Sequence, residues 1–253
     1  MHIPTYKKHD GGDCAVMFIH GFMGGPSQFA DLEAAVYEIG CSCVSVLLPG
    51  HGGGVDQFVK FGVSHWQGHV QEEIDKIKGD YRQIFLVGHS MGGLLALNAS
   101  LVKENQIAAV MLLSTPLKIN LFNPRMLWAK LRLLAFPKSH EIKAAYVKSN
   151  SLTAAKFFVY PLFVKAFINF YRLVGRTRAR LSEVFVPVYM FHSKNDETTS
   201  YRSVALLCAG LCNTETTVFS LDKSWHAFYC AEEREIIKEQ LIQMIREVGA
   251  GSE

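Results

Sequence analysis

The sequence has no run of about 18 or more consecutive apolar residues, although 49% of its 253 residues are hydrophobic. A membrane-spanning helix needs roughly 20 such residues, so no transmembrane helix is predicted. The first residues, MHIPTYKKHDGGD, also lack the apolar segment of a secretory signal. We therefore expect a globular, cytoplasmic protein with an ordinary hydrophobic core.

The six cysteines lack the paired spacing of a zinc site, which excludes the common structural zinc folds. In a chain of this size with no signal, buried free thiols are the expected state. This expectation covers every cysteine: Cys14, Cys41, Cys43, Cys208, Cys212 and Cys230. The sequence also lacks internal repeats and low-complexity tracts.

Short apolar segments alternate with helical ones along most of the chain. The predicted strands are Ala15–Ile19, Cys43–Leu47, Ile84–Val87, Ala109–Leu113, Val188–Phe191 and Thr216–Phe219. The predicted helices are Pro26–Ile39, His65–Lys78, Met91–Lys103, Tyr201–Leu211 and Ala231–Val248. This order predicts an α/β fold with a mainly parallel central sheet and helices on both faces. Residues 3–8 could add an antiparallel edge strand.

One segment interrupts this alternation and differs in composition. From Lys118 to Ser182 there are 13 Lys or Arg residues and one acid, Glu141, so the segment carries +12 while the remainder carries −9. It also holds 11 of the 29 aromatic residues. An insertion at the carboxyl end of a strand lies over the ligand side of an open sheet. We predict a helical cap over residues 117–183, inserted into a core formed by residues 1–116 and 184–253.

The sequence VGHSMGG places Ser90 between two glycines at G-x-S-x-G spacing. A predicted strand precedes this motif and a predicted helix follows it. Gly88 and Gly92 would let the two backbones approach closely, and the serine hydroxyl would lie at the start of the helix. The pattern predicts a nucleophile elbow. A glycine-rich turn that contains a serine by chance is the alternative.

A serine nucleophile needs a base, and the base needs a carboxylate. Among ten histidines, His226 follows the last predicted strand and is the expected base, with a pKa near working pH. Asp196 follows the preceding strand and is the expected carboxylate, with Asp222 and Glu197 as alternatives. The order Ser90, Asp196, His226 matches an α/β-hydrolase arrangement.

The negative oxygen of an acyl-transfer intermediate needs donors placed in advance. The backbone N–H of Met91, directly after the nucleophile, is one candidate. The second is expected from the loop HGFMGG after the first clear strand, where Phe22 is preferred over Met23. The sequence HGGG at residues 51–54 looks similar to an oxyanion motif, but it follows the wrong strand.

The segments FIHGFMGGPSQF, LLPGHG, VGHSMGG, SKND and SWHAF together resemble those of α/β-hydrolase-fold serine esterases. The compact size and the small cap are most similar to the bacterial carboxylesterase and monoacylglycerol lipase group. The resemblance implies a triad of Ser90, Asp196 and His226, an oxyanion hole of Phe22 and Met91, and no metal or organic cofactor. A serine at the elbow excludes the dehalogenases, epoxide hydrolases and dienelactone hydrolases of this fold.

We therefore expect a serine hydrolase that cleaves small uncharged carboxylic esters of short to medium acyl chain, including monoacylglycerols. A thioesterase or a C–C bond hydrolase with the same triad is the enzymatic alternative. A non-catalytic binding protein on the same fold is the alternative from another class. The oligomeric state is left open between monomer and homodimer.

Aromatic residues of the cap and the oxyanion loop are the candidates for contact with substrate. These are Phe22, Met23, Trp128, Phe158, Phe163 and Phe167. Packing of the cap onto the core is the alternative role for many of them. The basic residues could form a solvated surface, contact anionic lipid, or attract acidic substrates. Nucleic-acid binding is not expected, because the basic stretch RLVGRTRARL contains no known motif.

Overall fold

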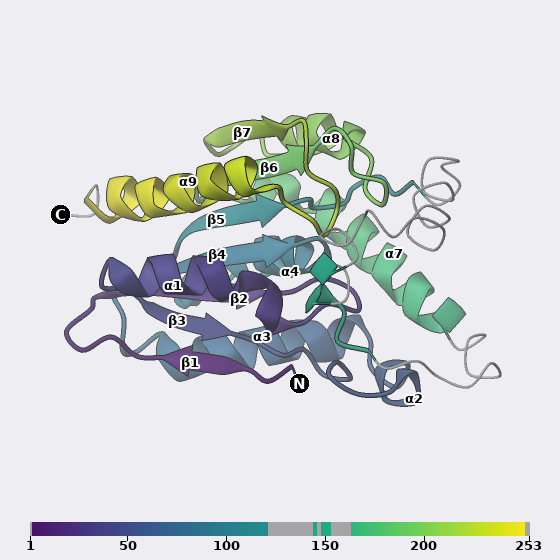
Figure 1. The fold of residues 1–253 in the computed structure, drawn as a ribbon, viewed down its shortest axis with the longest axis horizontal. Helices are drawn as coiled ribbons and strands as arrows, with labels where there is room; N and C mark the ends of the chain where they lie inside the picture. The colour runs from purple at the N-terminus through teal and green to yellow at the C-terminus, as the bar shows by residue number, and fades with distance from the viewer. Residues whose placement is uncertain (1, 121–143, 146–147, 153–162, 251–253) are drawn as a thin grey trace.

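The computed structural model describes residues 2–120, 144–145, 148–152 and 163–250 (Figure 1). Seven strands form one sheet in the order β1-β3-β2-β4-β5-β6-β7. Their bounds are β1 (Thr5–Lys7), β2 (Cys14–Ile19), β3 (Ser42–Ser45), β4 (Gln83–His89), β5 (Ile107–Leu113), β6 (Val188–Ser193) and β7 (Thr216–Leu221). The predicted mainly parallel sheet is confirmed: every neighbouring pair is parallel except β1 and β3.

Helices cover both faces of this sheet. They are α1 (Ala30–Glu38), α2 (Val55–Phe58), α3 (Val63–Ile77), α4 (Met91–Ser100), α7 (Phe163–Ala179), α8 (Arg202–Gly210) and α9 (Ala231–Ala250). Helices α1 and α9 lie on one face, and α3 and α4 lie on the other (Figure 1). Short 3-10 turns are η1 (Pro26–Phe29), η2 (Lys103–Asn105) and η5 (Leu181–Glu183).

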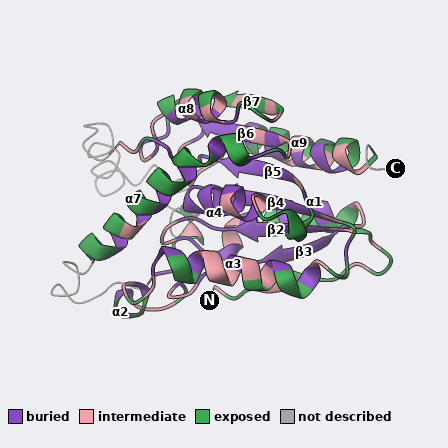
Figure 2. Ribbon diagram, turned by 180° about the vertical axis from the view of Figure 1, so that it is seen from behind, coloured by how far each residue is buried: buried purple, intermediate pink, exposed green. Residues whose placement is uncertain are grey.

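The five inner strands, β2 to β6, are almost wholly buried, whereas the edge strands β1 and β7 are partly exposed (Figure 2). Because side chains alternate along a strand, Val16 and Phe18 of β2 join the core under α1 and α9. Met17 and Ile19 join the core under α3 and α4 instead. The side chains of the sheet therefore pack into two hydrophobic layers, one on each face.

The predicted elements differ from the observed ones mainly at their ends. The predicted helix 26–39 is divided into η1 and α1, with Pro26 in the first turn of η1, where its missing N–H costs nothing. Helix α2 was not predicted, since four residues are too short for a helical period to show. The expected edge strand is confirmed as β1, in antiparallel pairing with β3.

The longest described element within residues 117–183 is helical and lies beyond the carboxyl ends of the strands, while Ile119 forms an isolated antiparallel bridge with Thr199. Helix α7 occupies this position, and it precedes β6 along the chain (Figure 1). None of the described helices is both long and apolar enough to cross a membrane. The boundaries 117 and 183 of the cap stay a prediction.

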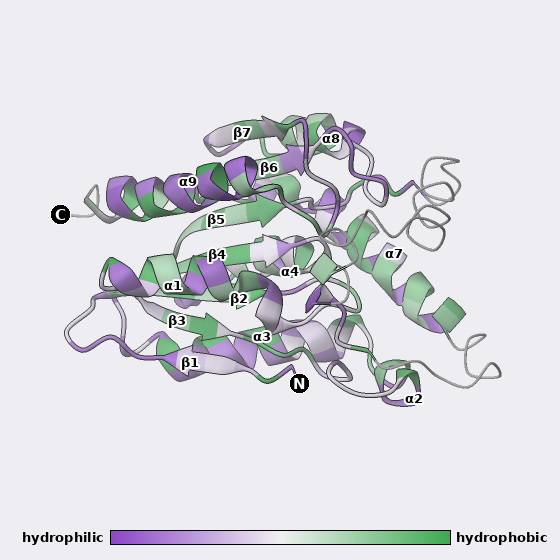
Figure 3. Cartoon of the chain, in the orientation of Figure 1, coloured by the Kyte–Doolittle hydropathy of each residue, from purple (hydrophilic) through white to green (hydrophobic). Residues whose placement is uncertain are grey.

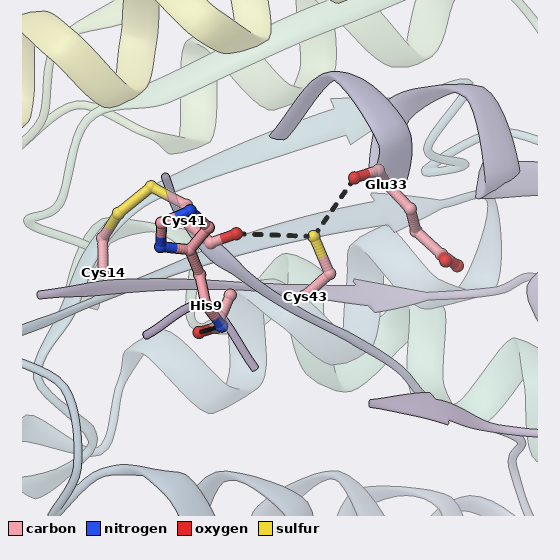
Figure 4. Close-up of a disulfide and its surroundings, with 6 residues drawn as sticks. His9, Cys14, Glu33, Cys41 and Cys43 are labelled. Atoms are coloured by element: carbon pink, nitrogen blue, oxygen red, sulfur yellow. Dashed lines mark hydrogen bonds between the residues drawn. A yellow bond between two sulfur atoms is a disulfide. The ribbon is translucent and has the colours of Figure 1, made fainter. Parts of the chain in front are cut away.

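The expectation that all six cysteines are free was wrong. Cys14 and Cys41 form a disulfide with their Cα atoms 5.1 Å apart (Figure 4). The parallel register of β2 and β3 pairs Ala15 with Ser42, so the residues one position earlier lie opposite each other. Sequence spacing did not reveal this register. Cys43 is a buried free thiol, and burial together with Glu33 raises its pKa to about 12.

Candidate active site

Ser90 lies on the sharp turn between β4 and α4. Its backbone has φ 53° and ψ −118°, a conformation that residues other than glycine rarely adopt. A Cβ added to Gly92 would lie 1.9 Å from the carbonyl oxygen of Ile19. A Cβ added to Gly88 would lie 2.5 Å from the backbone of Gly92 and Gly93. The elbow therefore requires glycine on both sides of the serine, as the motif predicted.

The structure brings the three predicted polar residues together at the carboxyl edge of the sheet. His226 Nε2 lies 3.1 Å from Ser90 Oγ, and His226 Nδ1 lies 2.8 Å from Asp196 Oδ2. All three residues are buried, with exposed fractions of 6% for Ser90, 5% for Asp196 and 9% for His226. The Nδ1–H donates to the carboxylate, which leaves Nε2 free to accept the serine proton.

Electrostatics around His226 favour its protonated form. Burial lowers the pKa of His226, but the charge and hydrogen bond of Asp196 and the charge of Glu197 outweigh it and raise the pKa above its usual value. Burial would raise the pKa of Asp196, yet His226, His192 and the Thr199 N–H together lower it. The carboxylate therefore stays ionised and stabilises a positive imidazole.

The two alternative carboxylates occupy other positions. Asp222 is exposed and forms an ion pair with Lys194 at 2.8 Å. Glu197 is buried, and its Oε2 accepts a hydrogen bond of 3.1 Å from the backbone N–H of His226. Asp196 Oδ1 accepts from the N–H groups of Thr198 and Thr199, which leaves Oδ2 directed at the imidazole. The geometry selects Asp196 as the partner of the imidazole.

Glu233 was missed by the sequence reasoning, and it fixes the loop that carries His226. Its Oε1 accepts hydrogen bonds from the N–H groups of Asp222 at 2.7 Å and Lys223 at 2.9 Å. Its Oε2 accepts from the N–H of Ser224 at 2.8 Å and from the hydroxyl of Ser224. The one available signal was an acid in the first turn of the helix that follows His226.

The loop after β2 lies directly against Ser90. A Cβ added to Gly21 would lie 2.9 Å from Ser90 Cβ. Nε2 of buried His20 accepts from the N–H of Leu48 at 3.0 Å, so Nδ1 carries the proton and donates to Gly21 O at 3.0 Å. Burial lowers the pKa of His20 well below its usual value, which keeps this tautomer neutral.

The two oxyanion candidates, Phe22 and Met91, directly follow Gly21 and Ser90, the residues that lie against each other. Within the described part of the chain, neither the Phe22 N–H nor the Met91 N–H has a hydrogen-bond acceptor. Met91 begins α4, where the first amides of a helix point outward unpaired. Met23 has a positive φ of 62°, and its carbonyl accepts from the N–H of Ser151 at 2.9 Å. The HGGG sequence leads instead into α2.

Two other histidines near the site contact backbone carbonyl groups. His51 Nδ1 contacts Leu48 O at 3.2 Å, and its ring packs edge-on against His20. His89 Nε2 contacts the carbonyl of His226 at 2.8 Å, and burial lowers the pKa of His89 to about 3. A neutral His89 therefore donates to the loop that carries the base.

The predicted substrate-contact residues lie in different surroundings. Phe22 packs against Phe167 and Phe170, each with ring centroids 5.3 Å away, and Phe167 is 41% exposed. Phe163 is buried and packs against Phe58. Met23 is partly buried and packs against the hydrophobic core. Trp128 and Phe158 lie outside the described residues. Among the described residues, no cluster of three or more His, Cys, Asp or Glu side chains could hold a metal.

Comparisons with known proteins identify relatives of this chain. The model of the hydrolase family described as serine aminopeptidase, S33, matches residues 12–234. The thermostable monoacylglycerol lipase of Bacillus sp. (strain H-257) is 24% identical over 231 residues, which cover 88% of this chain and 86% of that protein. A solved structure reported with the metagenome-derived lipolytic enzymes LipS and LipT has a TM-score of 0.76 and 19% identity, covering 96% of this chain and 97% of that one. The monoacylglycerol lipase of Paleococcus ferrophilus has a TM-score of 0.70 and 16% identity, covering 96% and 98%.

Proposed function

Because the chain belongs to the hydrolase family described as serine aminopeptidase, S33, we propose that it is a serine hydrolase of carboxylic esters. The observation that carries the proposal is the buried chain of contacts from Ser90 through His226 to Asp196. This arrangement supplies a nucleophile, a base and a carboxylate in the order that acyl transfer requires. A binding protein would gain nothing from a buried imidazole directed at a serine.

Hydrolysis proceeds in two halves. His226 Nε2 takes the proton of Ser90 as its Oγ attacks the ester carbonyl, and Asp196 stabilises the resulting imidazolium. The N–H groups of Phe22 and Met91 hold the negative oxygen of the tetrahedral intermediate. His226 then protonates the leaving alcohol. Water enters, gives a proton to His226 and attacks the acyl-enzyme carbonyl to form a second tetrahedral intermediate. As that intermediate collapses, the bond to Ser90 Oγ breaks, His226 returns the proton to Oγ, and the acid leaves.

The substrates of this proposal are small uncharged esters with short to medium acyl chains, including monoacylglycerols. The named relatives that act on monoacylglycerol support this class. Phe22 carries one oxyanion N–H and packs against half-exposed Phe167, so an apolar surface adjoins the site. An acyl chain that packs against these rings would gain about 25 cal/mol of binding free energy per Å² of apolar area removed from water.

The test is the rate of hydrolysis of p-nitrophenyl esters from acetate to palmitate. We expect a maximum at short or medium chains, and Ser90→Ala should lower kcat/KM by at least about 10³-fold, since the nucleophile is lost. Ser100→Ala, at the far end of α4, is the matched control and should retain activity. Fluorophosphonate should label the wild type at Ser90 and leave Ser90→Ala unlabelled.

Two results would contradict the proposal. Full ester hydrolysis by Ser90→Ala would exclude Ser90 as nucleophile. Labelling of Ser90 without turnover of any ester would keep the nucleophile and exclude the substrate class. Acyl-thioesters and aminoacyl p-nitroanilides should then be compared, because the same nucleophile attacks both kinds of carbonyl.

A further inference from the structure

Helix α7 presents three different surfaces along its 17 residues. One surface is buried against the core and contains Phe163, Ala166, Phe170, Leu173, Val174 and Thr177. A second is apolar and exposed, with exposed fractions of 60% for Val164, 41% for Phe167, 47% for Ile168 and 39% for Tyr171. A third is basic and contains Lys165, Arg172 and Arg176. Hydrophobic and hydrophilic bands accordingly alternate along α7 (Figure 3).

The exposed apolar residues form one continuous stripe. Their spacing of i, i+3, i+4 and i+7 places Val164, Phe167, Ile168 and Tyr171 on one side of a helix. Figure 2 shows that the outer side of α7 is exposed along most of its length. Single exposed apolar residues are common on protein surfaces, but an ordered stripe of four large ones marks a contact surface.

The basic side of α7 lines a hollow of about 280 Å³. Lys165, Arg172 and Arg176 form one wall, and Lys60 and His65 lie in the other. The two walls are close, since a Cβ added to Gly62 would lie 2.8 Å from Asn169 Nδ2. The first turn of α3 opens into the same hollow through Val63 and Ser64, so the positive end of the helix dipole adds to the positive potential.

No described carboxylate lines this hollow to neutralise its positive charge. Helix α7 contains no acid, and the hollow is lined by four cationic side chains and no carboxylate. In the described part of the chain, none of Lys60, Lys165, Arg172 and Arg176 forms an ion pair. Lys60 donates only to the side-chain carbonyl of Gln57. Four such charges around one concave surface attract an anion of compact, multiply accepting geometry, such as a phosphodiester.

We propose that α7 docks the protein on an anionic phospholipid surface, with a lipid phosphate held in the hollow and the apolar stripe inserted beside it. The two surfaces adjoin on one helix, which matches the headgroup and acyl regions of a bilayer interface. A free phosphate would use the hollow but not the stripe, and an apolar protein partner would use the stripe but not the hollow. The pairing of both favours lipid.

This docking also gives the site an orientation. Phe167 belongs to the stripe and packs against Phe22, which carries an oxyanion N–H in the proposed mechanism. A bilayer that covers the stripe would therefore lie next to the entrance of the proposed active site. The docking concerns a different surface from catalysis, so the two proposals can fail separately.

The test is co-sedimentation with vesicles of phosphatidylcholine alone or mixed with phosphatidylglycerol. Wild type should bind the mixed vesicles and bind the neutral ones far more weakly, and raised salt should release it. Arg172→Gln with Arg176→Gln should weaken binding to mixed vesicles by roughly 10- to 30-fold, at about a fivefold loss for each cation near an anionic surface. Val164→Ser with Ile168→Ser should weaken it by roughly tenfold through the lost apolar contact.

Matched controls separate docking from general charge and from catalysis. Lys78→Gln with Lys103→Gln removes two cations at the opposite end of α3 and α4, and it should leave binding within about twofold of wild type. Ser90→Ala should bind vesicles as wild type does. The Arg172 and Arg176 variant should hydrolyse soluble p-nitrophenyl butyrate at the wild-type rate.

Three results would overturn the docking proposal. Equal binding to neutral and anionic vesicles would show that the hollow plays no part. Equal losses in the Arg172/Arg176 and Lys78/Lys103 variants would reduce the effect to net charge. Complete release by millimolar inorganic phosphate, with no effect of the Val164 and Ile168 substitutions, would assign the hollow to a soluble anion.

Discussion

Replacement of Glu233 by Gln should show how far the loop of His226 depends on one carboxylate. Glu233 is 8% exposed and accepts three backbone N–H groups and one hydroxyl from residues 222–224. A glutamine keeps one oxygen, so it can accept two of these four bonds. Its amide nitrogen then faces the other two donors, which lose their acceptor.

The magnitude follows from the two lost bonds. A hydrogen bond to a charged group is worth about 1.5–3 kcal/mol, and relaxation of the loop recovers part of the loss. We expect Glu233→Gln to lower the free energy of unfolding at neutral pH by about 3 kcal/mol. For a protein of this size that corresponds to a fall in Tm of roughly 6–12 °C. Hydrolysis should slow as well, because Ser224 lies two residues before His226.

The pH dependence gives a second readout. Burial raises the pKa of Glu233, but Ser224 and the backbone N–H groups of the loop outweigh it and lower the pKa below its usual value. A depressed pKa in the folded state contributes stability that is present above the unfolded pKa and is lost as pH falls through the folded pKa. The deficit of Glu233→Gln should therefore be largest near neutral pH and shrink in acid.

Urea unfolding at neutral and acidic pH checks this reasoning, with Glu232→Gln as the control. Glu232 is the adjacent acid, and it forms an exposed ion pair with Lys223 at 2.5 Å. Its replacement should cost less than about 1 kcal/mol. The reasoning is refuted if both variants lose the same stability, or if the deficit of Glu233→Gln does not change with pH.

Three further expectations concern the site and the fold. Asp196→Asn removes the charge that raises the pKa of His226 and leaves the burial that lowers it. The acidic limb of the kcat/KM profile should therefore move to lower pH, and the rate should fall by about 10³–10⁴-fold. An acidic limb at the wild-type pH would contradict the role assigned to Asp196. Gly92→Ala should abolish soluble expression or cost several kcal/mol through the clash with Ile19 O, whereas Gly68→Ala, with open space in α3, should raise stability by up to about 1 kcal/mol in thermal unfolding. Cys14→Ser with Cys41→Ser should lower stability by about 3 kcal/mol by urea unfolding, because the disulfide spans 27 residues; equal stability of wild type with and without reductant would contradict this.

The sheet and the positions of the polar residues were predictable, because they depend on local sequence. Apolar runs such as 107–113 are continuous only in strands covered on both faces, and the helices between them impose parallel pairing. Once the strands are parallel, residues that follow them meet at one edge. This is why Ser90, Asp196 and His226 could be predicted to lie together without any knowledge of their distances.

The rest depended on contacts that sequence spacing does not carry. The Cys14–Cys41 bond follows from a parallel register between β2 and β3, which the apolar pattern leaves open. Glu233 acts through the fold of a loop rather than through a motif, and an acid in the first turn of a helix is usually explained by the helix dipole. The basic residues of α7 could be counted from the sequence. The structure was needed to show that three of them, Lys165, Arg172 and Arg176, line one hollow together with Lys60.

Backbone strain in this fold is concentrated where the proposed chemistry takes place. Of the four described residues other than glycine that have positive φ, three follow the carboxyl ends of adjacent strands: Met23 lies in the loop after β2, Ser90 directly after β4 and Ser114 directly after β5. The fourth, Gln106, precedes β5. Each such conformation costs about 1–3 kcal/mol and persists only when its surroundings fix it. Here the Ser90 N–H donates to Leu113 O at 2.8 Å and the Ser114 N–H to Phe191 O at 2.8 Å, so each strained turn is held by the next strand. These hydrogen bonds, together with the burial of the strands, offset the cost of the strained backbone at Ser90. The packed sheet therefore fixes the position of the proposed nucleophile at its edge.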